Sequence, residues 1–293
     1  MTKTPGTPES SENKTNPLRR YVRPGLLPTI FCAGCGGGTV LNCFCRAVDE
    51  LELDPKEMVM VTGIGCSSWI PSPYFLADTL HTTHGRAIAF ASGVRVMAPG
   101  MKVVVIAGDG DISGIGGNHL IHAARRNIDL TVFMINNSIY GMTGGQVAPT
   151  TPQDVTTTTT PHGNVEAPFD VASLVAAAGG TYVARWTTYH VFDLVKSMKA
   201  ALAHRGFSFI EIVGQCTTSY AKAVGKRSAA DFLADYKDRS VRIKKAAEMT
   251  AEELRDRIVV GPLRHEEGAA EFCDRLHGLT ERVSAAALSE VAR

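Results

Sequence analysis

Residues 102–137 read KVVVIAGDGDISGIGGNHLIHAARRNIDLTVFMINN, and this stretch carries the fold that we predict. It holds two apolar runs, at 102–107 and 130–135, in which hydrophobic residues follow one another without alternating with polar ones. Such runs are typical of strands whose two faces are both covered by helices. The segment from Asn118 between them has the pattern of a helix. Strand, helix and strand in this order indicate a parallel pair joined by a helical crossover.

The same alternation continues on both sides of this stretch. Two more runs, MVMV at 58–61 and SFIEIV at 208–213, have the composition of buried strands. Further helices are expected from Gly37 and Gly85, and after Phe169 and His190. The sequence therefore predicts an α/β fold built on a doubly wound parallel sheet.

The composition excludes several classes of protein. The chain has 293 residues, 44% hydrophobic and 20% charged, with a net charge of +1. This is too apolar and too evenly charged for a disordered protein, and it lacks the basic excess of a general nucleic-acid binder. No apolar run approaches the roughly 20 residues that cross a bilayer, so no membrane partner is expected. The polar first 22 residues carry no signal core, and we expect a cytoplasmic protein.

The chain divides into three parts on this pattern. A flexible N-terminal tail, rich in Pro, Ser and Thr, is expected over 1–24. The alternating strands and helices occupy 25–225. Residues 226–293 form a charged C-terminal extension with no clear strand, which we expect to fold as short amphipathic helices.

Polar and glycine-rich segments follow four of the expected strands, and these ends meet at one edge of a parallel sheet. Asp109 and Asn137 each stand at such an end, and their side chains offer the hard oxygen ligands that Mg²⁺ prefers. The glycines around Asp109 let backbone N–H groups approach a phosphate. The pattern indicates a magnesium–diphosphate site. Ordinary turns remain an alternative, as does a dinucleotide site, although GDGDISGIGG does not keep the GxGxxG spacing.

Seven cysteines are an odd number, and the chain shows no sign of secretion, so a disulfide framework is not expected. Cys32 and Cys35 form a CxxC pair, whereas Cys66 and Cys216 each follow a strand. Four thiolates at one sheet edge could hold an iron–sulfur cluster, with a structural zinc as the alternative. The remaining three, Cys43, Cys45 and Cys273, are expected to be buried free thiols.

Two sets of motifs resemble known proteins. GDG followed by NN resembles the motif of thiamine diphosphate enzymes. The blocks CAGCGGG, GIGCSSW, HTTHGRAIAFASGVRVMAPG, GDGDISGIGGNH, NNSIYGMTGGQ and GQC together resemble the β subunit of 2-oxoacid:ferredoxin oxidoreductases, in particular the 2-oxoglutarate branch. This resemblance covers about residues 25–220. It implies a sheet of the thiamine diphosphate-binding type, with 25–225 as the domain for coenzyme and cluster.

The resemblance also implies roles for individual residues. One 4Fe–4S cluster would be held by Cys32, Cys35, Cys66 and Cys216, and Mg²⁺ by Asp109, Asn137 and the carbonyl of Ile139. Thiamine diphosphate would contact four loops, whose residues are Ile64, Gly65, Cys66 and Ser67; His84 and Gly85; Gly110 and Asp111; and Gly141, Met142 and Thr143. Some relatives have Lys where this chain has Gly144, so the residue for a distal substrate carboxylate is not apparent.

The activity implied by the resemblance is the oxidative decarboxylation of a 2-oxoacid, in particular 2-oxoglutarate. Coenzyme A would take the acyl group and ferredoxin the electrons, in a reaction that can run in reverse. The catalytic carboxylate is expected from a partner α subunit. The expected assembly is a dimer of αβ heterodimers. A pyruvate or broad 2-oxoacid enzyme is the alternative, and a non-redox thiamine diphosphate decarboxylase or carboligase is a more distant one.

Overall fold

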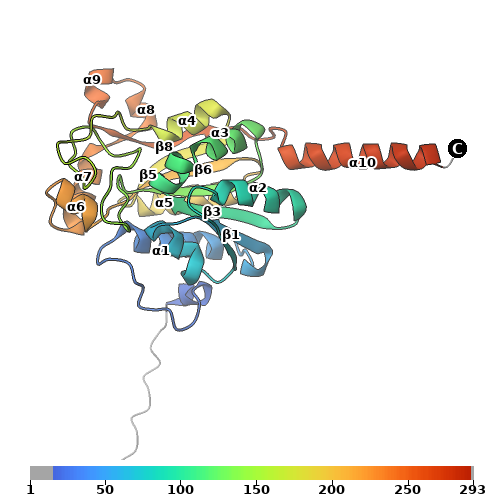
Figure 1. Cartoon of the computed structure of the whole chain (residues 1–293), viewed down its shortest axis with the longest axis horizontal. Coiled ribbons are helices and arrows are strands. Elements are labelled where there is room, and N and C mark those ends of the chain that lie inside the picture. Colours follow the sequence, from blue (N-terminus) through green and yellow to red (C-terminus); the bar gives the residue numbers. More distant parts are fainter. Residues whose placement is uncertain (1–15, 292–293) are drawn as a thin grey trace, which may run out of the picture.

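The computed structural model describes residues 16–291, and it is built around one eight-stranded sheet of order β2-β1-β3-β4-β6-β5-β8-β7 (Figure 1). All neighbours from β2 to β5 are parallel, β8 is antiparallel to β5, and β7 is parallel to β8. The predicted α/β fold class is confirmed. The strands are β1 Met58–Thr62, β2 Asp78–His81, β3 Lys102–Gly108, β4 Thr131–Asn136, β5 Tyr182–Thr187, β6 Ser208–Val213, β7 Ser240–Arg242 and β8 Ile258–His265.

Helices cover both faces of the sheet. Helices α1 (Gly36–Glu50) and α5 (Val191–Ala203) pack with one set of strand residues, which includes Val104 and Ile106. Helices α2 (Ala87–Met97), α3 (Gly117–Arg126) and α4 (Val171–Ala178) pack with the alternating set, which includes Val103 and Val105. Since both sets of β3 are buried, the strand is apolar from Val103 to Ala107, as the sequence predicted.

Two strands of the main sheet were missed in the sequence. The edge strand β2 is short and only partly buried, so it lacks an apolar run. In β5, Arg185 interrupts the apolar pattern, but its guanidinium pairs with the buried carboxylate of Glu211 on β6, at 2.8 Å. A charge in a central strand is tolerated here because a neighbouring strand neutralises it.

The prediction that residues 226–293 contain no strand was wrong. Strand β8 pairs with β5 and extends the sheet, and its sequence IVVGPLRH is broken by Gly261, Pro262 and charged residues. Proline and charge are typical of strands near a sheet edge, and they conceal the apolar pattern. The helices of this segment are α7 Ala229–Arg239, α8 Ile243–Ala246, α9 Ala251–Leu254 and α10 Phe272–Val291; α6 Ser219–Ala223 precedes them.

The flexible tail predicted over 1–24 was wrong for its last residues. Pro17–Tyr21 form a short 3₁₀ helix capped by Asn16, and Leu18 and Tyr21 are buried against the body. Residues 1–15 lie outside the described part of the chain.

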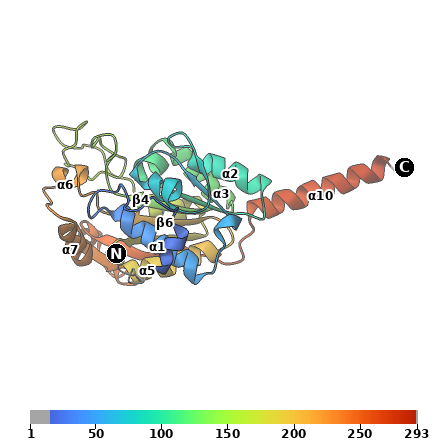
Figure 2. The same ribbon diagram turned by 90° about the horizontal axis from the view of Figure 1, so that it is seen from below.

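Helix α10 leaves the body as a long arm (Figures 1 and 2). Its first turns pack on the body, where Cys273 is buried and His277 Nε2 lies 3.0 Å from the carbonyl of Val96. Beyond them, Leu279, Val283 and Leu288 are exposed. Within residues 16–291, no helix is long and apolar enough to cross a membrane.

Candidate functional site

The loops that follow β1, β2, β3 and β4 meet in one narrow cleft at the carboxyl edge of the sheet. It is lined by Ile64, Gly65, Cys66, Ser67, His84, Gly108, Asp109, Gly110, Asp111, Asn137, Ile139, Tyr140, Gly141, Met142 and Thr143. The structure thus brings together every residue expected to contact the coenzyme or magnesium, except Gly85, whose N–H instead donates to Asp111, a residue of the cleft. The roles of these residues stay predictions, but their convergence is an observation.

Asp109 is a buried acid without a basic partner. Its Oδ2 accepts hydrogen bonds from Ser138 N, at 3.0 Å, and from the hydroxyl of Thr150. Burial raises the pKa of Asp109 to about 6. Among the described residues, no ion pair includes this carboxylate. A buried carboxylate facing a cleft without a countercharge fits a bound cation, because an isolated buried charge is costly.

Asp111 ties three of the loops together. Its Oδ1 accepts hydrogen bonds from Gly85 N, at 2.8 Å, and from Ile64 N, at 3.2 Å, and it lies 3.5 Å from His84 Nδ1. Gly63 packs directly against this carboxylate, since a Cβ at residue 63 would lie 2.2 Å from Asp111 Oδ2. Asp111 therefore fixes the loops that carry Ile64 and His84, in addition to lining the cleft.

The two asparagines after β4 have different surroundings. Asn136 points into the sheet, where its Nδ2 donates to Glu211 Oε1 at 2.7 Å. Asn137 lines the cleft, and its Oδ1 accepts a hydrogen bond from Ile139 N. Ser138 between Asn137 and Ile139 has φ of 60°, which turns the chain back over Asp109. Of the pair, only Asn137 can offer its side chain to a ligand in the cleft.

Two residues of the site were missed in the sequence. Thr150 belongs to the loop at 150–161, and its hydroxyl donates a hydrogen bond to Asp109 Oδ2. Tyr140 donates a hydrogen bond to the Gly110 carbonyl at 2.9 Å, and its ring lies 5.8 Å from that of His84. Gly110 is required here, because a Cβ would lie 2.3 Å from the Tyr140 ring. A tyrosine within the NNSIYG block could have been noticed, whereas nothing in the sequence marks Thr150.

The CxxC loop is bound to the segment after β6. Gly36 N donates to the carbonyl of Gln215, Gln215 Nε2 donates to that of Gly34, and Thr217 donates to that of Ala33, at 2.9–3.0 Å. These three bonds hold Cys32 and Cys35 next to Cys216, although about 180 residues separate them. Helix α1 begins directly after this loop, and its amide at Gly37 donates to Cys35 Sγ.

The four cysteines expected to bind a cluster lie near one another. Thr218 Oγ1 is 4.0 Å from Cys32 Sγ and 3.5 Å from Cys216 Sγ. Burial raises the pKa of Cys66 to about 11, and the thiols of Cys35, Cys216 and Cys32 each contribute to the rise. Cys66 also lines the cleft, and a Cβ at residue 141 of the cleft would touch Cys216 Sγ, at 3.5 Å.

This geometry bears on the kind of metal centre. Among the described residues, no three His, Cys, Asp or Glu side chains are placed to hold a single metal ion. The choice between a zinc ion and a four-iron cluster therefore rests on metal analysis of the protein.

The remaining cysteines are buried free thiols, as predicted. Burial raises the pKa of Cys43 to about 11 and those of Cys45 and Cys273 to about 12. Such thiols are inert and belong to the core.

Comparison with known proteins agrees with this site. The profile "Thiamine pyrophosphate enzyme, C-terminal TPP binding domain" matches residues 63–212. The 2-oxoglutarate synthase subunit KorB of Methanocaldococcus jannaschii is 50% identical over 92% of this chain and 98% of its own. The chain belongs to the KorB family of 2-oxoglutarate synthase subunits.

Two other relatives extend the comparison. The 2-oxoglutarate:ferredoxin oxidoreductase from Magnetococcus marinus, solved with 2-oxoglutarate, coenzyme A and succinyl-CoA bound, is 33% identical with a TM-score of 0.80, and the match covers 92% of each chain. The β subunit of a 2-oxoacid:ferredoxin oxidoreductase from Saccharolobus solfataricus is 42% identical, over 64% of this chain and 62% of its own. The likeness to KorB thus extends over more of this chain than the likeness to the Saccharolobus solfataricus subunit does.

Proposed function

We propose that this chain is the β subunit of a 2-oxoglutarate:ferredoxin oxidoreductase. The enzyme would convert 2-oxoglutarate and coenzyme A to succinyl-CoA and CO₂, reversibly, with electrons passing to ferredoxin. The observation that carries the proposal is the meeting of the Asp109–Asn137 cleft with the four cysteines, since Cys66 belongs to both. The KorB match over 92% of the chain favours 2-oxoglutarate over pyruvate or a broad range of 2-oxoacids.

The residues present fit the three groups that this function requires. Asp109, Asn137 and the Ile139 carbonyl would hold Mg²⁺, the glycine-rich loops the diphosphate, and Cys32, Cys35, Cys66 and Cys216 one 4Fe–4S cluster. When bound, thiamine diphosphate supplies the nucleophilic carbon and the electron sink, Mg²⁺ neutralises its diphosphate, and the cluster accepts electrons. The chain itself contributes a buried carboxylate, backbone donors and a set of neighbouring thiols.

The cleft is incomplete in one chain. It encloses about 50 Å³, whereas pockets for small molecules usually hold roughly 300–1,000 Å³. Ile64 and Met142 at its mouth are each 41% exposed, an apolar rim suited to being covered. A partner α subunit would complete the pocket and supply the carboxylate that activates the coenzyme. We expect an αβ heterodimer that itself forms a dimer. A cytoplasmic location stays a prediction.

Reconstitution tests this function. The chain purified alone without oxygen should be brown, with about four irons per chain, and inactive. Adding the α subunit should restore reduction of ferredoxin that depends on both 2-oxoglutarate and coenzyme A. Replacement of Cys66 by Ser should remove the colour, whereas Cys43→Ala, a buried thiol outside the site, should keep it. Full turnover by this chain alone, or a colourless protein that binds zinc, would refute the proposal.

A non-redox thiamine diphosphate enzyme is the second candidate, because the cleft alone would serve it. The clustering of four cysteines beside that cleft argues against it, since decarboxylation without oxidation needs no electron acceptor. Release of an aldehyde or a ligation product in place of an acyl-CoA would favour this candidate.

A further inference from the structure

A second pocket adjoins the coenzyme cleft and holds about 420 Å³. The pocket and the cleft share one lining residue, Ile139. The pocket is lined by Ile139, Gly144, Gly145, Thr156, Thr157, Thr158, Ser219, Lys222 and Ala223. It therefore lies between the end of the cleft loop, the threonine-rich loop and helix α6.

Hydrogen bonds fix the walls of this pocket. Thr158 N donates to the Gly145 carbonyl at 3.0 Å, which holds the threonine-rich loop in place. Ser219 Oγ donates to the Gly141 carbonyl at 3.3 Å, which holds α6 against the cleft loop. Gly144 and Gly145 have φ of 118° and 91°, so side chains are disfavoured there and the floor stays open. These two bonds connect the threonine-rich loop and α6 to the loop that carries Gly141 and Gly145.

The pocket carries one charge. Lys222 is the only charged residue in its lining, and among the described residues no ion pair includes it. Thr156 and Thr158 are exposed, as Lys222 is, and within residues 16–291 their hydroxyls have no hydrogen-bond partner. An ammonium group accompanied by free hydroxyl donors is suited to a carboxylate.

We propose that Lys222 binds the distal carboxylate of the dicarboxylic substrate. This rests on the proposed function, because 2-oxoglutarate differs from monocarboxylic 2-oxoacids by that group. A substrate held with its 2-oxo end at the coenzyme would place its distal carboxylate in this neighbouring pocket. Lys222 then supplies, from α6, the positive charge that Gly144 cannot. The pocket selects for 2-oxoacids that end in a second carboxylate.

The test compares two substrates on the reconstituted αβ complex. Replacing Lys222 by Met keeps the length of the side chain and removes its charge. We expect kcat/KM for 2-oxoglutarate to fall about 10- to 100-fold, mainly through KM, since a hydrogen bond to a charged group is lost. The value for 2-oxobutyrate should stay within about twofold, which also reports that the variant is folded and loaded.

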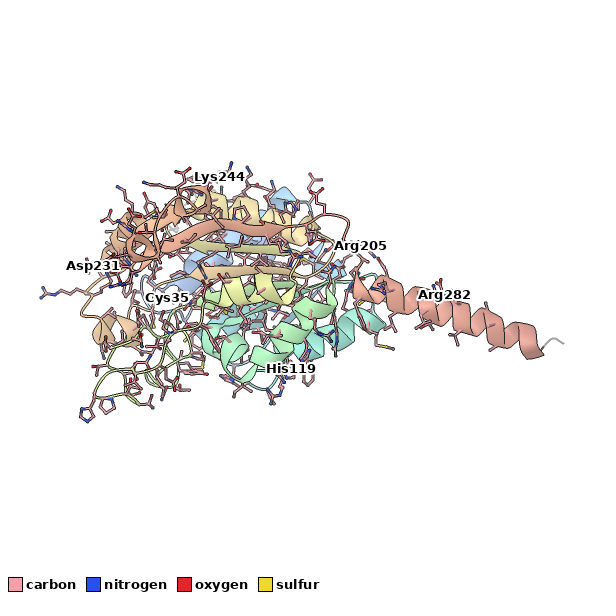
Figure 3. All side chains as sticks on the ribbon, turned by 90° about the horizontal axis from the view of Figure 1, so that it is seen from above. Cys35, His119, Arg205, Asp231, Lys244 and Arg282 are labelled. Atoms are coloured by element: carbon pink, nitrogen blue, oxygen red, sulfur yellow. The ribbon has the colours of Figure 1, made fainter. Side chains whose placement is uncertain are left out.

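Two further variants sharpen the test. Lys222→Arg should retain most of the activity with 2-oxoglutarate, and Lys222→Glu should lose more than Lys222→Met. Lys244, an exposed lysine without an ion pair among the described residues, provides the matched control as Lys244→Met (Figure 3). An equal loss with both substrates, or no loss with 2-oxoglutarate, would overturn this assignment of Lys222. A wild-type complex that is inactive with every 2-oxoacid would instead overturn the proposed function.

Discussion

The two ends of the molecule differ in how the chain is held. At the carboxyl edge of the sheet, Asp111, Gln215 and Thr150 each bind backbone or side chains from a different loop. At the other end, α10 extends away from the body (Figure 3). Leu279, Val283 and Leu288 on this helix are exposed. A site that must align groups from distant segments needs such cross-links. The part of α10 beyond His277 is mostly exposed, so we expect it to contribute little to the stability of the body.

The largest expected effect is at the buried acid of the site. Asp109→Asn keeps the shape of the side chain but removes its charge, so magnesium and the coenzyme should bind weakly. We expect the activity of the αβ complex to fall by more than about 100-fold, since even partners behind a metal ligand are worth 10- to 100-fold. Coenzyme affinity measured by calorimetry should fall in parallel. The exposed acid Asp78, changed to Asn, serves as control.

The next effect concerns the charge pair beneath the site. Arg185→Met leaves Glu211 buried without its cation, which should cost about 3–5 kcal/mol in the free energy of unfolding. Chemical denaturation measures this. The double variant Arg185→Met with Glu211→Gln should recover part of the loss, because the uncompensated charge is gone. If the single and double variants were equally stable, the pair would not matter to the sheet.

A smaller effect separates two glycines of the chain. Gly63→Ala would force a Cβ against Asp111, and we expect a loss of about 1–3 kcal/mol together with reduced activity. Gly93 lies in α2 with open space around it, and Gly93→Ala should stabilise the protein by up to about 1 kcal/mol. Thermal unfolding of both variants gives the comparison. A neutral Gly63→Ala would mean that Asp111 can move away freely.

The smallest effect is expected at the arm. Removal of residues 279–293 keeps Cys273 and His277, which contact the body. The free energy of unfolding of the single chain should change by less than about 0.5 kcal/mol, as for other exposed positions. The melting temperature of the truncated chain should also be compared with that of the full chain at a concentration where the full chain self-associates. If the truncated chain melts several degrees lower there, the arm contacts a second copy of the chain.

The sequence predicted those parts of the fold whose signal is local. The apolar runs of β1, β3 and β4, together with that of β6, which Glu211 interrupts, predicted the central sheet. Polar residues at the ends of these strands predicted the cleft. Strand β5 was missed because Arg185 interrupts its apolar pattern. The carboxylate of Glu211 that neutralises Arg185 comes close only in the folded sheet. Strand β8 was missed because its Pro and charged residues suit a strand near the edge.

The site shows the same division. Asp109, Asn137 and the four cysteines could be singled out as candidates, because metal ligands require particular side chains, and their roles stay predictions. Thr150 and Lys222 could not, since threonine and lysine are common in loops and surface helices. Only the fold places Thr150 beside a buried carboxylate and Lys222 in the lining of a pocket that holds no other charged residue.

The most direct measurement of the central claim is the visible spectrum of the oxygen-free αβ complex on addition of 2-oxoglutarate and coenzyme A without ferredoxin. The account predicts that the brown colour of the wild-type complex bleaches as electrons reach the cysteine-bound centre. It also predicts that Asp109→Asn is equally brown and does not bleach. A colourless wild-type complex, or bleaching of the Asp109 variant as fast as the wild type, would contradict it.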